Sequence, residues 1–426
     1  MKTYLKPPPE PPAIRDAMAK ASKREEEGLP VYDFSSGNIG RLLLEYNVFS
    51  DMSIQTGDMP TSFAPIAEAM YEGLKKSFVG SPKGLAYSPT GGTSPQKKTV
   101  IDYFKQVHHL SLEEDDLDRV IITAGGQQAM AAALRSISPD AKVMAPQWDY
   151  APVTGIASDE PWEFCKLPVS DGLGFSLDDL REEVEEGAVF YNSMPNNPSG
   201  YVSAEKLAGA AEIMAEHNGG IIWDAPYLFT MFRLEDGKAS FDSEFLEKEV
   251  EKFAKVAQEY EDNMCILSSI SKTCLAAGLR FGFATAPEEW IQNMNGIIGR
   301  ENLSSPTPSF IIGDEILKTF LDQGVKAHEW VSEILADRVN YLLDKDIPLI
   351  LPDNGKFGAL YVLMEATERG SDFAEKLGEK GVISVTGEPF YGGSVDVVRL
   401  SLVSVPFVEG DRFWKENVDN LAEQIS

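Results

Sequence analysis

Residues 220–226 read GIIWDAP and give the clearest signal of the fold. Its residues are apolar without alternation until Asp224 and Pro226 close the run. A short continuous apolar run of this kind is typical of a strand buried on both faces of a parallel sheet. Four further runs share this form: VIITAG (120–125), KVMAP (142–146), AVFYNS (188–193) and MCILSSIS (264–271). Helical stretches such as GQQAMAAALRSI fill the intervals, so the pattern predicts an α/β fold, a three-layer α/β/α domain with a mostly parallel sheet.

The length of 426 residues exceeds the ~150 that are typical of one domain, so at least a second domain is expected. Beyond about residue 310 a long helical stretch precedes the strand-like segments GALYVLM, VISV and VVRLSLV, which predict a smaller α+β domain. We therefore expect an N-terminal arm with part of the small domain at 1–60, a large domain at 61–310 and a C-terminal small domain at 311–426. The arm is proline-rich and then polar and helical, as in segments that wrap a partner subunit. The charged segment 233–262 has apolar residues at helical spacing and predicts an exposed amphipathic helix.

The composition disfavours several classes of function. The 38 basic and 67 acidic residues give a net charge of −29, which repels nucleic acid and anionic lipid surfaces. The three cysteines form no CxxC pair, and the four histidines show no metal-ligand spacing, so we expect neither structural disulfides nor a metal site. We find no apolar stretch of about 18 residues and no signal-peptide pattern, and these observations together favour a cytoplasmic protein.

Polar residues gather where the predicted strands end, and these positions carry the chemistry. Asp224 closes a buried strand, where a carboxylate needs a cationic partner. The backbone N–H groups of Gly125, Gly126 and Gln127 open a helix and can cradle a phosphate. Arg399 interrupts an apolar strand and must find an anion. The chemical motifs, in chain order, are YSPTGG from Tyr87, TAGGQQA (123–129), APQWDY around Trp148, PNNPSG (195–200), WDAPY (223–227), SISKTCLAAGLRFG (269–282) and VVRLSLV (397–403).

Together these motifs resemble those of class I/II aminotransferases, which are fold-type-I enzymes that depend on pyridoxal 5'-phosphate. The resemblance runs in the family's order from Tyr87 to Arg399 and covers most of the chain. It implies the fold-type-I architecture, a large cofactor-binding domain beside a smaller one. It also implies a homodimer whose active sites are shared between the subunits.

The resemblance assigns a role to each motif around the cofactor. Lys272 would form a Schiff base with the cofactor aldehyde and then act as the general base, because a desolvated lysine has a lowered pKa. Asp224 would pair with the pyridine nitrogen and keep the ring protonated, while Tyr227 and Asn197 would contact its phenolic oxygen. Trp148 would lie on the face of the ring. The phosphate contacts implied in the same way come from Gly125, Gly126, Gln127, Ser269, Arg280 and, from the neighbouring subunit, Tyr87.

The resemblance also implies how a substrate is held. Arg399 would bind the α-carboxylate of an L-amino acid, with Asn197, Gly37 and Asn38 lining the same pocket. Arg300 is placed like the arginine that receives a distal carboxylate across the dimer interface in dicarboxylate-specific members. Without that contact, aromatic or branched-chain amino acids become the favoured substrates. The implied reaction is amino transfer to a 2-oxo acid, with glutamate and 2-oxoglutarate as one pair.

Two alternatives stay open. A carbon–sulfur β-lyase, or another fold-type-I lyase or synthase, would keep every cofactor residue and differ only in what leaves from Cβ. A non-catalytic regulator would need a DNA-binding head, and the segment before the large domain is short and not basic. The chain departs from the family pattern at Gln96-Lys97, where Leu-Arg is usual, and at Thr386, where proline is usual. The long charged insertion between Tyr227 and Lys272 leaves the subfamily open.

Overall fold

A computed structural model describes residues 12–45, 49–50, 53–54, 63–79, 83–170, 172–323 and 327–425. The proline-rich start of the chain, at residues 1–11, lies outside these ranges. The polar helix expected after it is α1 (Ala13–Glu26).

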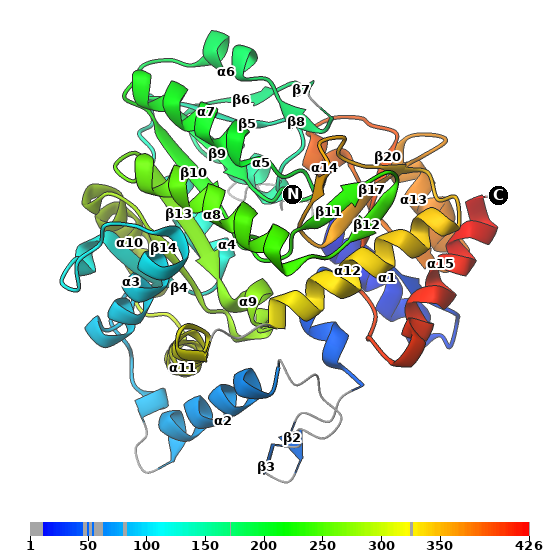
Figure 1. Cartoon of the computed structure of the whole chain (residues 1–426), viewed down its shortest axis with the longest axis horizontal. Coiled ribbons are helices and arrows are strands. Elements are labelled where there is room, and N and C mark those ends of the chain that lie inside the picture. The colour runs from blue at the N-terminus through cyan, green and yellow to red at the C-terminus, as the bar shows by residue number, and fades with distance from the viewer. Residues whose placement is uncertain are drawn as a thin grey trace, which may run out of the picture.

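The central element of the large domain is a mixed, mostly parallel sheet of seven strands (Figure 1). Only β14 runs antiparallel to its two neighbours, and the five runs of the sequence pattern are all strands of this sheet. The spatial order is β4 (Val120–Thr123), β14 (Gly282–Thr285), β13 (Met264–Ser269), β10 (Gly220–Asp224), β9 (Val189–Ser193), β5 (Lys142–Pro146) and β6 (Glu163–Leu167).

Helices cover both faces of this sheet, which gives the predicted three layers. One face packs against α4 (Gly126–Arg135), α5 (Ala151–Ala157) and α10 (Glu288–Asn302). The opposite face packs against α3 (Ser94–His108), α6 (Leu177–Glu183), α7 (Ala204–Glu216) and α8 (Ser243–Glu259). The strands are therefore apolar on both faces, as their sequences indicated.

Shorter elements complete the large domain. The helix α9 (Ile270–Thr273) follows β13, and the 3-10 turn η4 (Ala277–Leu279) precedes β14. Outside the layers, α2 (Ala64–Phe78) packs along α11 (Thr307–Gln323), next to the 3-10 turn η2 (Lys83–Leu85). The remaining short elements are the turn η3 (Leu117–Arg119) and the paired strands β2 (Phe49–Ser50) with β3 (Ser53–Ile54) and β7 (Val169–Ser170) with β8 (Gly174–Phe175).

The small domain is built on a four-stranded antiparallel sheet. Its order is β15 (Leu349–Ile350), β17 (Tyr361–Glu365), β20 (Val397–Ser401) and β19 (Val385–Thr386). The N-terminal segment joins this domain, because β1 (Tyr32–Asp33) pairs in parallel with β18 (Val382–Ile383). The helices here are α1, α12 (Ala327–Asp344), α13 (Gly370–Glu379), α14 (Glu388–Tyr391) and α15 (Arg412–Ile425), with the turns η1 (Ile39–Leu43) and η5 (Glu409–Asp411).

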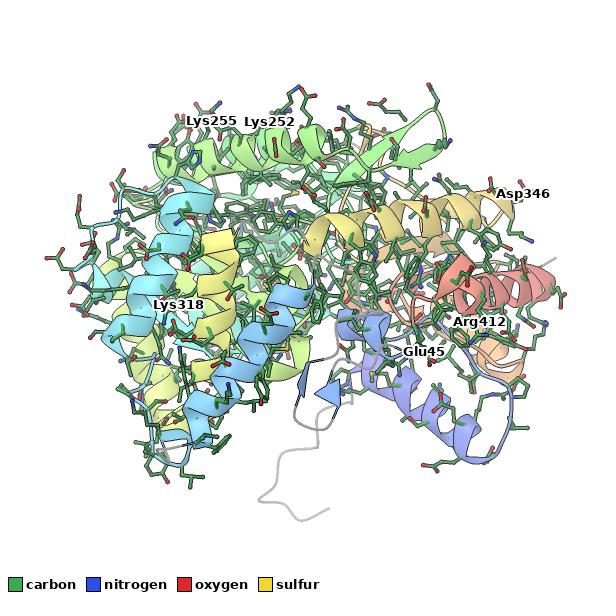
Figure 2. The ribbon with its side chains drawn as sticks, turned by 60° about the horizontal axis from the view of Figure 1, so that its bottom comes forward. Glu45, Lys252, Lys255, Lys318, Asp346 and Arg412 are labelled. Atoms are coloured by element: carbon green, nitrogen blue, oxygen red, sulfur yellow. The ribbon has the colours of Figure 1, made fainter. Side chains whose placement is uncertain are left out.

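The charged insertion is a hairpin followed by a helix. The strands β11 (Phe232–Glu235) and β12 (Lys238–Ser240) form a three-stranded sheet with β16 (Lys356–Phe357), and α8 follows. Lys252 and Lys255 lie on the outer side of α8 (Figure 2). Phe245 and Phe253 of the same helix are buried against the large sheet. The predicted amphipathic helix is thus confirmed for Ser243–Glu259 only, and the expectation of a helix was wrong for the first part of 233–262, which forms the hairpin.

The expected boundary between the two domains at residue 310 falls inside α11. This helix packs against α2 and α3, which belong to the large domain. We propose that the small domain begins after α11, and the boundaries expected from the sequence otherwise stay predictions.

The salt bridge between Arg338 and Asp411 generates a test of stability. Arg338 is fully buried, and its Nη2 and Nε each lie 2.7 Å from a carboxylate oxygen of Asp411. Asp411→Ala leaves the guanidinium buried without its counter-charge, which costs about 3–5 kcal/mol. We expect this loss in the free energy of unfolding measured with urea. Asp419→Ala, which breaks a half-exposed pair with Lys345, is the control and should cost at most about 1 kcal/mol.

Candidate active site

The predicted cofactor residues meet at one edge of the large sheet. Asp224 ends β10, Asn197 lies in the turn after β9, and Lys272 lies in the helix after β13. Arg280 precedes β14, whose antiparallel direction brings its start to the same edge. Ligands of α/β proteins bind at the carboxyl ends of parallel strands, so this edge is the candidate site.

A phosphate cradle is formed where α4 begins. Gly125 has a φ of 83° and stands at the N-cap of α4, and a Cβ built there would lie 2.3 Å from Nη2 of Arg280. A Cβ on Gly126 would lie 3.8 Å from the Ser269 hydroxyl oxygen. Three groups thus surround a space that a side chain at Gly125 or Gly126 would fill. They are the positive end of α4, the guanidinium of Arg280 and the hydroxyl of Ser269. This set of donors fits a phosphate.

Arg280 and Gln127 are held at this cradle by hydrogen bonds. Arg280 donates from Nη2 to the carbonyl oxygen of Ala124, at 3.3 Å, and from Nη1 to that of Ala277, at 3.0 Å. The Gln127 side-chain oxygen accepts a bond of 2.7 Å from the Tyr150 hydroxyl. Both residues that the phosphate motif implied therefore lie around the start of α4.

Asp224 is a buried carboxylate that forms no ion pair with any described residue. Its Oδ2 accepts a hydrogen bond of 2.7 Å from the hydroxyl of Tyr191. Burial raises the pKa of Asp224 and the Tyr191 hydrogen bond lowers it by less, so that the net pKa is about 6. A buried carboxylate of this kind is ready for a cationic partner such as a protonated pyridine.

Lys272 has the environment of a reactive amine. Its Nζ donates a hydrogen bond of 2.7 Å to the carbonyl oxygen of Gly37 and lies 5.8 Å from the centre of the Tyr227 ring. Burial holds the pKa of Lys272 below its ordinary value, and the charges of Arg399 and Arg280 lower it further. A lowered pKa makes the neutral, nucleophilic amine available near neutral pH.

Tyr227 contacts Tyr361, a residue that the motifs did not indicate. The two rings meet edge to face at 6.2 Å, and their hydroxyl groups are hydrogen-bonded. Burial alone would raise the pKa of Tyr361, but the charges of Lys272 and Arg399 outweigh it, and the net pKa lies below the usual value. A Cβ on Gly37 would lie 1.9 Å from the Tyr361 hydroxyl, so this position accepts only glycine.

Arg399 is fully buried in β20 and pairs with no acidic side chain among the described residues. It donates from Nη1 to Oδ1 of Asn197 and from Nη2 to the carbonyl oxygen of Ser35, both at 3.3 Å. Among the described residues its Nε has no hydrogen-bond partner. The guanidinium carbon lies 3.9 Å from the centre of the Tyr361 ring and 4.7 Å from that of Phe390. A buried cation with unused donors is suited to an incoming carboxylate.

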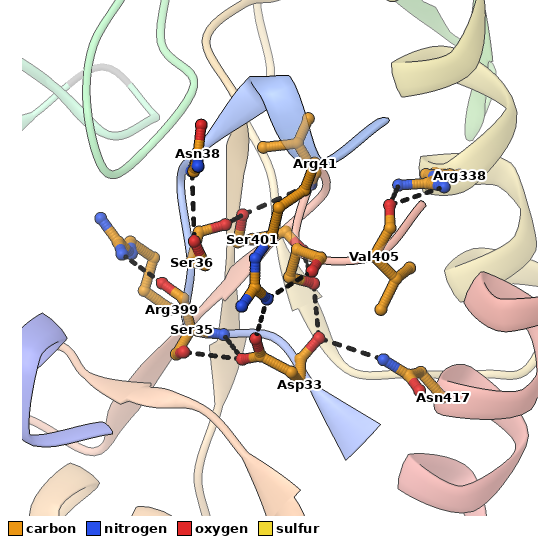
Figure 3. A network of polar contacts seen from close by, with 12 residues as sticks. Asp33, Ser35, Ser36, Asn38, Arg41, Arg338, Arg399, Ser401, Val405 and Asn417 are labelled. Carbon is orange, nitrogen blue, oxygen red and sulfur yellow. Dashed lines mark hydrogen bonds and ion pairs between the residues drawn. The ribbon is translucent and has the colours of Figure 1, made fainter. Parts of the chain in front are cut away.

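A polar network fixes the segment that faces Lys272 and Arg399 (Figure 3). Asp33 accepts hydrogen bonds from the backbone and hydroxyl of Ser35, at 2.7 and 2.6 Å, and pairs with Arg41. Ser401 of β20 donates to the carbonyl oxygen of Ser36 at 2.7 Å. Asn38 caps η1, with its side-chain oxygen 3.2 Å from the Gly40 nitrogen. The small domain thus positions Gly37 and Asn38, which the sequence placed at the substrate pocket.

Trp148 lies among small-domain side chains. Its ring is 4.9 Å from that of Tyr391 and packs in a buried cluster with Ile383 and Phe390. The neighbouring Tyr150 interacts electrostatically with Asp224, among other charged groups of the site. The cofactor-face role of Trp148 stays a prediction, and Tyr150 is an aromatic residue of the site that the motif assignment missed.

Tyr87 and Arg300 lie at the surface of the subunit. Tyr87 is 84% exposed and lines an open hollow together with Ala124 and Ser304. Arg300 is exposed near the end of α10, where its Nε donates to the Gly296 carbonyl oxygen at 3.2 Å. Both were expected to act across a subunit boundary, and these roles stay predictions.

Sequence reasoning also missed Tyr191 and Tyr361. Each is a tyrosine inside an otherwise apolar strand, AVFYNS and GALYVLM. A buried phenol usually finds a hydrogen-bond partner, so each hydroxyl was a signal of a nearby polar group. Which group it meets depends on the register of neighbouring strands, which the motifs do not give.

The described ranges contain neither a candidate metal site nor a candidate membrane span. No group of three or more His, Cys, Asp and Glu side chains in them could hold a metal ion. None of the helices described is both long enough and apolar enough to cross a membrane.

Comparisons with known proteins identify the family of this chain. The family model for aminotransferases of class I and II matches residues 52–406. An aspartate aminotransferase of Pyrococcus horikoshii is 28% identical over 337 residues, which cover 74% of this chain and 78% of the relative. A probable N-succinyldiaminopimelate aminotransferase of Mycobacterium tuberculosis is 34% identical over 155 residues, 34% of this chain and 38% of the relative.

Solved structures share the fold. The aspartate aminotransferase of Thermus thermophilus with maleate superposes with a TM-score of 0.76 at 19% identity, covering 99% of this chain and 100% of that one. The expected fold class is thereby confirmed. The chain belongs to the class I and II aminotransferase family, whose members are pyridoxal-phosphate-dependent enzymes.

Proposed function

We propose that this aminotransferase moves the amino group of an L-amino acid to a 2-oxo acid, with glutamate and 2-oxoglutarate as one pair. The observation that carries the proposal is the short segment Ser35–Gly37. Its carbonyl oxygens hold both Arg399 and the amine of Lys272. Arg399, the proposed partner of the α-carboxylate, and Lys272, the proposed acceptor of the Cα proton, are therefore held by the same short segment.

Arg399 binds the substrate carboxylate in this proposal, and Lys272 moves the Cα proton. The unused Nε of Arg399 and the positive charge of the guanidinium favour a carboxylate. Asn197 and the Tyr361 ring keep the guanidinium in place. Because the pKa of Lys272 is lowered, its amine can take a proton and return it within one cycle.

The cofactor residues have complementary tasks. Pyridoxal phosphate, when bound, supplies an electron sink for the charge that builds up on Cα. Asp224 holds the pyridine nitrogen, and Tyr227 and Asn197 donate to the phenolic oxygen. The start of α4, Ser269 and Arg280 hold the phosphate.

The distal end of the substrate is proposed to meet Arg300 of a neighbouring subunit. The two relatives reported above are named for aspartate and N-succinyldiaminopimelate, which both carry a second carboxylate. Arg300 is exposed and free of acidic partners among the described residues, so it can reach out of its own subunit.

The experiment that tests the reaction is an absorbance titration of the holoenzyme with a panel of amino acids. We expect the cofactor's visible band to bleach with acidic amino acids and to return when 2-oxoglutarate is added. Pyruvate and ammonia released without a 2-oxo acceptor would instead identify a lyase. A band that no amino acid changes would indicate a binding protein.

Replacing the lysine tests its role directly. Lys272→Ala should retain the cofactor without a covalent bond and lose exchange of the substrate Cα proton, because no other amine is placed to move it. Exchange is measured by NMR in deuterated water, and a rate at least about 10²-fold below that of the unmodified enzyme is expected. Normal exchange would contradict the assignment. Lys166→Met, a change of another partly buried lysine, is the control.

Removing the guanidinium tests the carboxylate site. Arg399→Leu should raise the KM for the amino acid about 10²-fold, since a charge-assisted contact of about 2–3 kcal/mol is lost. The absorbance of the bound cofactor should stay unchanged. Because Arg399 has no ionic partner among the described residues, the fold should tolerate the change. Arg369→Gln removes an exposed arginine and should leave the KM unaltered.

We also propose that the chain is a cytoplasmic homodimer. Exposed apolar side chains gather on α2, η2 and the end of α10, namely Leu74, Phe78, Val79, Leu85, Tyr87 and Leu303. A patch of this kind marks an interface. The three cysteines are free thiols, as a reducing compartment allows.

Light scattering checks the dimer. The expected mass is about twice the 46.8 kDa of one chain. Tyr87→Ala should keep that mass and weaken cofactor binding about tenfold, because a phosphate contact from the neighbouring subunit is lost. A monomer with full activity would contradict shared active sites.

A further inference from the structure

The hydroxyl of Tyr191 is the one hydrogen-bond donor that the Asp224 carboxylate meets among the described residues. Tyr191 lies on β9 opposite Ile222 of β10, and Asp224 lies opposite Ser193. The Tyr191 side chain therefore extends diagonally from β9 to the neighbouring β10, where its hydroxyl lies 2.7 Å from Oδ2 of Asp224. The side chain is fully buried in the layer beneath the site.

This bond has a fixed direction. Burial, with the nearby charge of Asp224, holds the pKa of Tyr191 well above its ordinary value, so the phenol keeps its proton and remains a donor. Oδ2 is thereby occupied, and Oδ1 accepts no hydrogen bond from a described residue. The carboxylate thus has one engaged oxygen and one available oxygen.

We propose that Tyr191 is a positioning residue that fixes the Asp224 carboxylate and leaves Oδ1 as the oxygen that meets the ring nitrogen of the cofactor. This inference rests on the proposed role of Asp224. A carboxylate that rotates freely loses orientational entropy when it binds the ring. A carboxylate that a neighbouring donor already holds does not lose this entropy on binding.

The same bond favours the charged form of Asp224. A donor that bonds to the carboxylate lowers its pKa, so removal of the donor raises it. The other titratable groups that interact with Asp224 are Tyr150 before α5, Tyr227 after β10 and Cys265 on β13. Burial raises the pKa of all three, so they keep their protons near neutral pH. Asp149, whose charge acts on Tyr191, is also buried, and burial raises its pKa to about 7. The shift assigned to Asp224 is therefore read against a control variant that keeps Asp149.

The experiment removes one oxygen atom. Tyr191→Phe preserves the volume of the side chain and deletes the donor. Apoenzyme is titrated with pyridoxal phosphate, with tryptophan fluorescence as the signal, at several values between about pH 5 and pH 8. We expect the dissociation constant at neutral pH to rise about tenfold. The pH at which affinity is half lost should move upward by about one unit, because the carboxylate becomes protonated more readily.

Tyr103→Phe is the matched control. Tyr103 is also a buried tyrosine whose hydroxyl makes one contact, with Ser268 at 3.1 Å, but it is not bonded to Asp224. Both variants lose a buried phenol oxygen and should unfold at similar urea concentrations. Only Tyr191→Phe should shift the pH profile of cofactor binding.

Two outcomes would overturn the inference, and they can be distinguished. If Tyr191→Phe binds like the control while Asp224→Asn loses affinity, Asp224 keeps its proposed role and Tyr191 does not position it. If Asp224→Asn also binds normally at every pH, the proposed role of Asp224 fails and the inference fails with it.

Discussion

Burial of two unpaired charges is the constraint on which this structure depends. The carboxylate of Asp224 and the guanidinium of Arg399 both lie inside the protein, and neither forms an ion pair with a described residue. Burial of a charge costs several kcal/mol unless a partner compensates it. Polar neighbours reduce the cost here, namely Tyr191 for the acid and Asn197 and Ser35 for the base. We propose that the molecules that bind at this site supply the rest of the compensation.

The two domains supply these charges from different sheets. Asp224 ends a strand of the large parallel sheet, and Arg399 lies in the antiparallel sheet of the small domain. The segment around Gly37 lies between them, bonded to Lys272 on one side and to the small-domain strands on the other. The distance between Asp224 and Arg399 therefore depends on how the two domains pack. A rotation of one domain would change the contact of the Gly37 segment with Lys272 and its contact with the small-domain strands together.

Much of this arrangement could be predicted from the sequence because its signals are local. A buried strand shows as an apolar run, and the residues that close it, such as Asp224 and Lys272, are read from the same short stretch. The pairs Tyr191 with Asp224 and Tyr361 with Arg399 could not be read in this way, since they depend on the register between strands. The same holds for Trp148, whose position after a strand was clear while the direction of its ring was not. The fold and the family are confirmed by the comparisons, and the roles of single residues stay predictions.

The bond between Arg399 and Ser35 joins positions that are 364 residues apart in the chain. Contacts at such separations form late in folding, after the loops between them have closed. During synthesis the strand that carries Arg399 leaves the ribosome after the strands of the large sheet, when that sheet can already assemble. A nascent chain could thus build the start of α4, where we propose that the phosphate binds, before it acquires Arg399, for which we propose the substrate carboxylate. The site proposed for the cofactor phosphate and the site proposed for the amino acid would then form at different times in the life of each molecule.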